Sequence, residues 1–157
     1  MQLAKARGAN VIAITSESKA QQLKDLGADK VLSREDDLIK TLGKSSVDVV
    51  IDLVAGEQWP KLLEVLKPKG RYAVSGAIGG ALVELDIRTL YLKDLTFFGC
   101  TVIEPGVFKS LVNFIEQEKI KPIVAQTLPL SEIVTAQQVF SQKLHVGKIV
   151  LTIPHSE

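Results

Sequence analysis

Three loops and one strand end in this chain carry small residues directly after an apolar run. They are Thr15 with Ser16, residues 53–56, residues 76–80, and the segment ending near Cys100. Small residues let the backbone approach a bound ligand closely. In parallel α/β sheets, ligands bind beyond the carboxyl ends of the strands. These segments therefore predict a ligand-binding edge, provided that the apolar runs before them are strands.

Nucleophilic and metal-ligating residues are sparse. Cys100, the single cysteine, has no histidine or aspartate near it in sequence that would complete a catalytic set, which favours a small buried thiol. His145 is expected at the surface or at a helix end, and His155 in a frayed terminus. Because neither CxxC nor HxxxH spacing occurs, we predict no metal site in this chain and assign no catalytic residue.

The elements that would position these loops alternate between strand and helix. A β-branched run at 47–51 is typical of a strand covered on both faces, and apolar residues at helical spacing predict a helix over 57–66. Ser33 resembles the start of a capping box that opens a helix to about Leu42. Further strands are expected at 11–15, 29–32, 71–75, 95–102 and 148–153. Further helices are expected at 17–26, 87–93, around 108–115 and at 131–143, and an extended segment is expected at 123–129. This alternation predicts an α/β fold with a parallel sheet flanked by helices.

Composition limits the class of protein. The 157 residues suit one domain, and 46% of them are hydrophobic, which is enough for a sizeable core. The net charge of +1 favours neither nucleic acid nor an anionic membrane surface. No apolar run approaches the roughly 20 residues that span a bilayer. One cysteine rules out an internal disulfide, and we expect a cytoplasmic protein.

Five motifs together resemble the nicotinamide-binding half of the medium-chain dehydrogenase/reductase superfamily, and the likeness runs along the whole chain. They are QLAKARGANVIAITSESKAQQLKDLGADKVL, VDVVIDLVAG, LKPKGRYAVSGAIGG, LTFFGCTV and HVGKIVLTI. The branch they resemble most contains quinone oxidoreductases and zinc-type alcohol dehydrogenase-like reductases. The resemblance implies a partial Rossmann-like dinucleotide-binding domain at 1–103 and the tail of a catalytic domain at 104–157, with Pro105 at the boundary.

The end of the first strand indicates which cofactor the resemblance implies. An acidic residue there would hold the ribose 2′-hydroxyl of NAD, but this chain has Thr15 and Ser16. A hydroxyl with the nearby Lys19, and Arg34 after the next strand, would instead hold a 2′-phosphate, which predicts NADPH. Glu17 could take the acidic role if the turn differs. Alternatively, Ser16 is only an N-cap and Lys19 a solvated helix residue.

Further cofactor contacts follow from the resemblance alone. Val54 matches a loop beside the nicotinamide ribose, and Gly76 with Ala77 matches a turn whose backbone runs near the nicotinamide. Phe98 and Cys100 match a strand end that flanks the ring. The alternatives are tight turns for the first three residues, and core packing for Phe98 and for the Cys100 thiol.

The chain begins inside a helix, without the strand and glycine-rich turn that open a dinucleotide-binding unit. We therefore expect a truncated sheet with weak cofactor affinity, because the pyrophosphate cradle is missing. Strands near Val11 and Val49 would be left with open edges. The chain then either draws its two halves together, recruits another strand, or is a piece of a longer protein.

The resulting hypothesis is the cofactor-binding part of an NADPH-dependent oxidoreductase that acts on a small molecule, a quinone or an α,β-unsaturated carbonyl. Alternatives are a fragment of a zinc-dependent alcohol dehydrogenase, or a non-catalytic nucleotide-binding or dimerisation module. A methyltransferase shares the sheet class but usually has an acidic residue where Ser16 stands. By resemblance, we expect a homodimer through the strand from Leu95 to Val102.

Overall fold

The structure is a computed structural model that describes residues 1–153. It contains two compact units, one formed by Met1–Glu35 together with the chain from Pro105 onward, the other by Asp36–Glu104. The division at Pro105 falls where the sequence suggests a domain boundary, whereas the division after Glu35 lies inside the expected 1–103 domain. The assignment of 1–103 and 104–157 to two functional domains stays a prediction.

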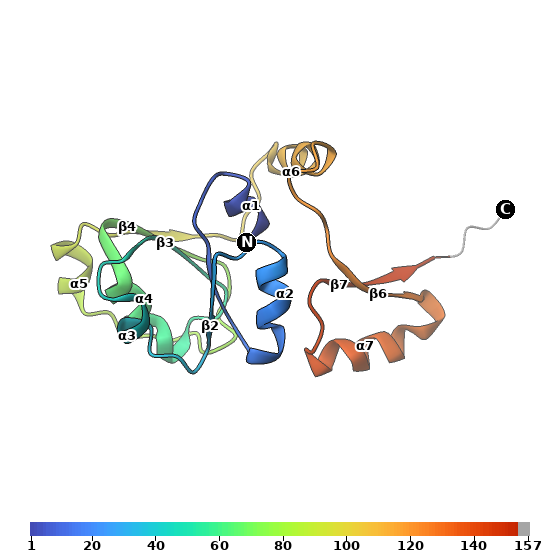
Figure 1. Ribbon diagram of the computed structural model, residues 1–157, viewed down its shortest axis with the longest axis horizontal. Helices are drawn as coiled ribbons and strands as arrows, with labels where there is room; N and C mark the ends of the chain where they lie inside the picture. Colours follow the sequence, from blue (N-terminus) through green and yellow to red (C-terminus); the bar gives the residue numbers. More distant parts are fainter. Residues whose placement is uncertain (154–157) are drawn as a thin grey trace. The chain divides into compact units, whose positions relative to one another are not determined.

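The amino-terminal part of the first unit is a helix followed by a βαβ segment (Figure 1). Its elements are α1 (Gln2–Lys5), β1 (Ile12–Thr15), the 3-10 helix η1 (Glu17–Lys19), α2 (Ala20–Asp25) and β2 (Lys30–Ser33). β1 and β2 are parallel. Lys5 Nζ lies 2.7 Å from the Asp29 carboxylate, which also accepts from the Val11 amide. The Lys5 hydrogen bond, with that of Val11, lowers the pKa of Asp29.

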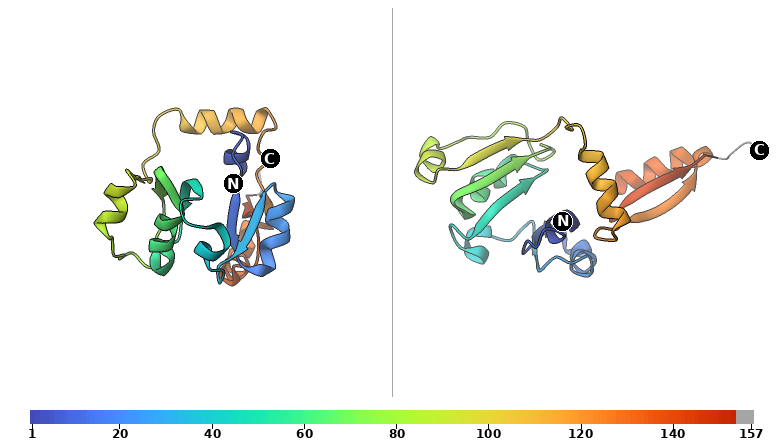
Figure 2. Two further views of the ribbon diagram at one scale, coloured as in Figure 1. Left: turned by 60° about the vertical axis from the view of Figure 1, so that its left-hand side comes forward. Right: turned by 90° about the horizontal axis from the view of Figure 1, so that it is seen from above.

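The carboxyl-terminal part of the same unit holds two helices and a second pair of strands. Its elements are α6 (Val107–Glu116), β6 (Val124–Pro129), the 3-10 helix η3 (Leu130–Glu132), α7 (Ile133–Gln142) and β7 (Lys148–Thr152). β6 and β7 are parallel, and α7 runs along them (Figure 2). The side chain of Gln2 exchanges two hydrogen bonds with the Lys121 backbone, and Arg7 lies over the Phe114 ring. These contacts join the two parts of the unit.

The second unit is a three-stranded parallel sheet in the order β3-β4-β5. Its elements are α3 (Leu38–Leu42), β3 (Val47–Asp52), the 3-10 helix η2 (Gly56–Gln58), α4 (Trp59–Val65), β4 (Leu66–Val74), α5 (Ile87–Leu92) and β5 (Thr96–Gly99). Figure 1 shows the helices grouped beside the sheet.

Within the second unit, only one face of this sheet is covered. The core on that face consists of Trp59, Leu63, Leu66, Tyr72 and Leu95, with Trp59 edge-on to Tyr72 at 6.0 Å between ring centroids. On the other face, Val49, Ile51 and Phe98 are 42%, 69% and 45% exposed. Within this unit, β3 is therefore covered on one face only, and the prediction of a strand covered on both faces is not met there.

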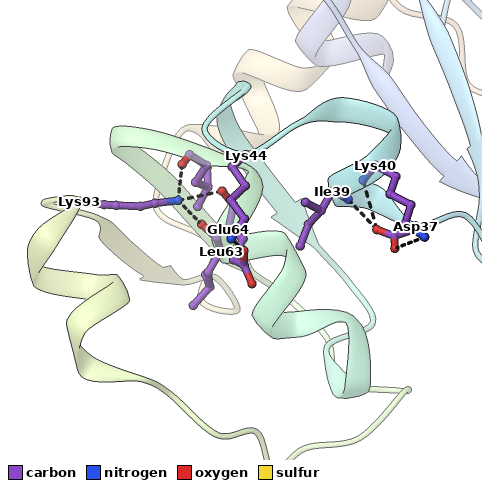
Figure 3. Close-up of polar contacts among 8 residues, drawn as sticks. Asp37, Ile39, Lys40, Lys44, Leu63, Glu64 and Lys93 are labelled. Atoms are coloured by element: carbon purple, nitrogen blue, oxygen red, sulfur yellow. Dashed lines mark hydrogen bonds and ion pairs between the residues drawn. The ribbon is translucent and has the colours of Figure 1, made fainter.

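Two predicted helix boundaries also differ from the structure. The capping residue of α3 is Asp37, not Ser33, because the Asp37 carboxylate accepts from the amides of Ile39 and Lys40 (Figure 3). The Ser33 hydroxyl instead accepts from the Glu35 amide within a turn. The helix predicted over 57–66 ends at Val65, and the strand predicted at 71–75 begins earlier, at Leu66, and includes Pro68–Gly70.

The carboxyl end of α4 is satisfied by a lysine from beyond α5. Lys93 Nζ donates to the carbonyls of Leu63, Glu64 and Leu66 at 3.1, 2.8 and 2.9 Å (Figure 3). Carbonyls in the last turn of a helix have no partner within the helix, and a cation there also suits the helix dipole. Burial lowers the pKa of Lys93. The contact ties α4 to the segment that leads into β5.

The parallel strands flanked by helices confirm the predicted α/β, Rossmann-like fold. Within residues 1–153, β1 pairs only with β2, and β3 pairs on one side only, with β4. Within its own unit, each of these two strands thus has the open edge that the sequence predicts. Across the same residues, no helix is both long and apolar enough to span a bilayer.

Candidate functional site

The first candidate site lies where β1 and β2 end. The register places Thr15 opposite Ser33, and the Arg34 amide donates to the Thr15 carbonyl at 3.1 Å. An open pocket of about 300 Å³ lies beside these strand ends. It is lined by Thr15, Ser16, Glu17, Ala20, Val31, Leu32 and Ser33. Three hydroxyl-bearing residues and one carboxylate therefore surround it.

The three residues expected at a 2′-phosphate are placed differently relative to this pocket. Ser16 lines it, and the Ser16 hydroxyl lies 3.2 Å from that of Ser18. Ser16 is the N-cap residue of η1, as the alternative expects, but its side chain makes no capping hydrogen bond. Lys19 ends η1 and Arg34 follows β2, and neither is among the lining residues. Glu17 does line the pocket.

The second candidate site belongs to the other unit and consists of the loops after β3 and β4. The Ser75 amide donates to the Asp52 carbonyl at 2.9 Å, and the Gly79 amide donates to the Val54 carbonyl at 2.7 Å. These bonds bring Val54 together with the predicted turn of Gly76 and Ala77. The side chain of Val54 is 48% exposed, and Ala77 is also exposed.

Glycine is required for the close approach of these two loops. A Cβ on Gly76 would lie 2.6 Å from the Leu53 carbonyl oxygen, and one on Gly79 would lie 2.9 Å from a Val54 methyl carbon. A Cβ on Gly56, which has a φ of +73°, would collide with the Gly79 backbone. The alternative of tight turns thus describes these loops correctly, but it does not exclude a ligand beside them.

A buried carboxylate stands at the base of the same loops. Asp52 is 5% exposed, and its Oδ1 accepts from the amides of Val54 and Ala55 at 2.8 and 3.0 Å. Its Oδ2 accepts from the Tyr72 hydroxyl at 2.6 Å. Desolvation by burial, followed by the bond to Asp52, raises the pKa of Tyr72, so the phenol remains a donor at neutral pH. Asp52 therefore links the loop that follows β3 to a buried side chain of β4.

The structure places Phe98 and Cys100 differently from two interpretations of the sequence. Phe98 does not pack in the core, because alternation along β5 directs Phe97 there and leaves Phe98 on the open face. Cys100 is exposed rather than a buried thiol, since it follows the end of β5, and its amide donates to the Val74 carbonyl at 2.8 Å. Phe98 pairs in register with Ala73 of β4. The expected dimer strand from Leu95 to Val102 is shorter, Thr96–Gly99.

Metal-binding groups do not assemble in the described part of the chain. Residues 1–153 contain no cluster of three or more His, Cys, Asp or Glu side chains suited to a metal ion. His145 lies beside the Phe140 ring at 5.6 Å between centroids, and its Nδ1 atom is buried without a hydrogen-bond partner. His155 lies outside the described residues.

Sequence reasoning missed the Asp52–Tyr72 bond and the unusual backbone at Ala55, where φ is +55° and ψ is −143°. One available signal was the alternation of β3 and β4, which puts Asp52 and Tyr72 on the same sheet face as Val50. No signal in the sequence pairs the two residues directly. Ser33 was also missed as a pocket residue.

Comparisons with known proteins agree on one family. The sequence model described as zinc-binding dehydrogenase matches residues 1–117. A "Putative quinone oxidoreductase YhfP" of Bacillus subtilis is 28% identical over 94% of this chain and 48% of its own length. An acryloyl-coenzyme A reductase of Metallosphaera sedula is 28% identical over 97% of this chain and 46% of its own length. The chain thus spans about half the length of these curated relatives.

A solved structure supports the same assignment. The crystal structure of a "putative alcohol dehydrogenase" from Sinorhizobium meliloti superposes with a TM-score of 0.88 at 40% identity, over 98% of this chain and 44% of that one. The motif resemblance found in the sequence is therefore confirmed. The chain belongs to the zinc-binding dehydrogenase family of the medium-chain dehydrogenase/reductase superfamily, a group of oxidoreductases, and corresponds to the carboxyl-terminal part of its relatives.

Proposed function

We propose that this chain is the cofactor-binding part of an NADPH-dependent oxidoreductase that transfers hydride to a quinone or an α,β-unsaturated carbonyl compound. The names of the relatives support the substrate class, since one is described as a quinone oxidoreductase and another reduces acryloyl-coenzyme A. The proposed activity is that of relatives about twice as long, of which this chain spans about half the length.

The observation that carries the NADPH proposal is the pocket at the end of β1. The strand ends in Thr15 and Ser16, both of which line the pocket, in place of the carboxylate that would bind an unphosphorylated ribose. Lys19 and Arg34 flank the pocket in sequence and would supply positive charge to a 2′-phosphate. The Glu17 carboxylate would repel the same phosphate. The proposed preference for NADPH over NADH therefore requires the attraction of the two cations to exceed the repulsion by this one carboxylate.

The nicotinamide end is proposed to lie against the loops of the second unit. When bound, the nicotinamide supplies the hydride, and the protein orients the ring. The exposed Val54 and Ala77, with the small Gly76, would let the ribose and ring approach the backbone. Phe98 and Cys100, both exposed, would flank the ring. No proton donor is assigned.

Ligands that represent only the adenosine end test the phosphate assignment. We expect 2′,5′-ADP to bind the chain about tenfold more tightly than 5′-AMP, which corresponds to roughly 1.4 kcal/mol. Calorimetry would measure both affinities, and amide shifts should map to Ser16 and Ser33. Lys19→Glu should abolish the preference, and Glu17→Gln should increase it.

The matched control is Lys24→Glu, which makes the same charge change on an exposed residue of α2 outside the pocket. It should leave the ratio of the two affinities unchanged. If Lys19→Glu and Lys24→Glu behave alike, the phosphate assignment is wrong. Tighter binding of 5′-AMP by the parent chain would instead indicate NADH.

Two alternatives keep specific support. The family description and the Sinorhizobium neighbour favour a zinc-dependent alcohol dehydrogenase, although residues 1–153 bring no metal-binding cluster together. A dimerisation module is favoured by β5, which pairs with β4 on one side and has an open second edge within the described chain. Sedimentation over a concentration series would show whether dimers form.

A further inference from the structure

We infer that Asp52 and Tyr72 are positioning residues that hold residues 53–56 in a strained conformation and thereby fix the nicotinamide end of the cofactor site. The inference rests on the proposed function for its ligand, but the geometry that it describes is a property of the second unit alone. Neither residue is proposed to touch the cofactor or the substrate.

The contacts form a continuous path from the core to the loop. Tyr72 is 2% exposed and packs against Trp59, so its hydroxyl is fixed by the core. That hydroxyl donates to one oxygen of Asp52, and the other oxygen accepts from the amides of Val54 and Ala55. The Tyr72 hydroxyl therefore orients the Asp52 carboxylate, and the carboxylate in turn orients residues 53–56.

The loop needs such a constraint because its backbone is unfavourable. Ala55 has φ +55° and ψ −143°, a region that side-chain-bearing residues rarely adopt. Backbone outliers of this kind persist only where the surroundings over-determine them, and they concentrate at functional sites. The two amide bonds to Asp52 lie at and directly before Ala55, where they oppose relaxation of the turn.

The position of the second loop, residues 76–80, depends on the position of the first, residues 53–56. The Val54 carbonyl accepts from the Gly79 amide at 2.7 Å, and Gly56 packs directly on the Gly79 backbone. A change at Ala55 would therefore move both the exposed Val54 side chain and the turn that contains Gly76. These are the residues proposed to meet the nicotinamide and its ribose.

Amide hydrogen exchange separates positioning from a general structural role. Tyr72→Phe keeps the ring in the core and removes only the donor to Asp52. We expect the amides of Val54, Ala55 and Gly79 to exchange at least tenfold faster, while the Cys100 amide changes less than twofold. Leu63→Ala is the control, because loss of a fully buried core side chain should accelerate all four amides together. Uniform acceleration in Tyr72→Phe would overturn the inference.

A second variant keeps the test valid if Tyr72→Phe unfolds the unit. Glycine adopts positive φ without a steric penalty, so Ala55→Gly should remove the strain that Asp52 opposes. In the Ala55→Gly background, the effect of either Tyr72→Phe or Asp52→Asn on exchange at Val54 and Gly79 should fall below threefold. An undiminished effect would show that strain at Ala55 is not what the pair restrains.

Two half-ligands connect the pair to the proposed function. Tyr72→Phe should weaken binding of reduced nicotinamide mononucleotide about tenfold and leave 2′,5′-ADP binding unchanged. If the parent chain binds neither half-ligand while exchange and rescue behave as expected, the proposed function fails and the positioning of the loop stands. If the parent binds reduced nicotinamide mononucleotide and Tyr72→Phe alters neither its affinity nor the loop exchange, the inference is wrong.

Discussion

Replacing Lys93 by methionine would remove three hydrogen bonds and keep most of the aliphatic stem. A hydrogen bond to a charged group contributes about 1.5–3 kcal/mol, but the three bonds here share one ammonium, whose burial opposes the charged form. Water can also reach the partly buried site and satisfy the freed carbonyls. We therefore expect Lys93→Met to lower the free energy of unfolding by about 2–3 kcal/mol.

The assay can be confined to the second unit. Trp59 is the single tryptophan of the chain and is 7% exposed in that core, so its fluorescence during urea unfolding reports this unit. At a slope near 2 kcal/mol per molar, the midpoint should fall by about 1–1.5 M without a change in slope. Lys67→Met is the matched control, since it removes only an exposed pair with Asp48 and should cost less than about 1 kcal/mol. Equal effects of the two variants would refute a stabilising role for Lys93.

Two further outcomes are expected from the same unit. Gly76→Ala should shift the amide resonances of Leu53 and destabilise the unit by about 1–3 kcal/mol, because the new Cβ would lie 2.6 Å from the Leu53 carbonyl oxygen. Gly99→Ala is the control: its Cβ would meet no atom within 4 Å, so neither the Leu53 resonances nor the stability should change. Burial and the Asp52 carboxylate raise the pKa of Tyr72, so its stabilisation is complete below about pH 10 and is lost as the pH rises through the folded-state pKa. Alkaline absorbance titration of Tyr91→Phe, in which Tyr72 is the only phenol, would detect the shift, and Tyr72→Phe should remove the added alkaline sensitivity.

Local patterns in the sequence predicted most of the elements because each pattern has a physical cause within a few residues. The β-branched run at β3 and the helical spacing around Leu63 both gave the correct element type. The start of α3 was wrong because Ser33 and Asp37 are both good capping residues, and the choice depends on which one the tertiary fold places beside free amides.

The candidate site was less predictable, because it depends on contacts between distant residues. The glycines of residues 76–80 indicated a close backbone approach, but only the structure identifies residues 53–56 as the partner. Likewise, residues 97 and 98 are both phenylalanine, and only the register of β5 with β4 decides which of the two side chains enters the core. Cofactor choice depends on the charges of Glu17, Lys19 and Arg34, whose balance a local pattern does not define.

The uncovered face of the β3-β4-β5 sheet affects how this chain should respond to temperature. Because Val49, Ile51 and Phe98 are not covered by their own unit, the folding of that unit removes less apolar surface from solvent than the folding of a sheet covered on both sides. Its heat-capacity change on unfolding should therefore be small for its length, and calorimetric melting should be broad. A polypeptide that covered this face would raise both the heat-capacity change and the cooperativity of melting.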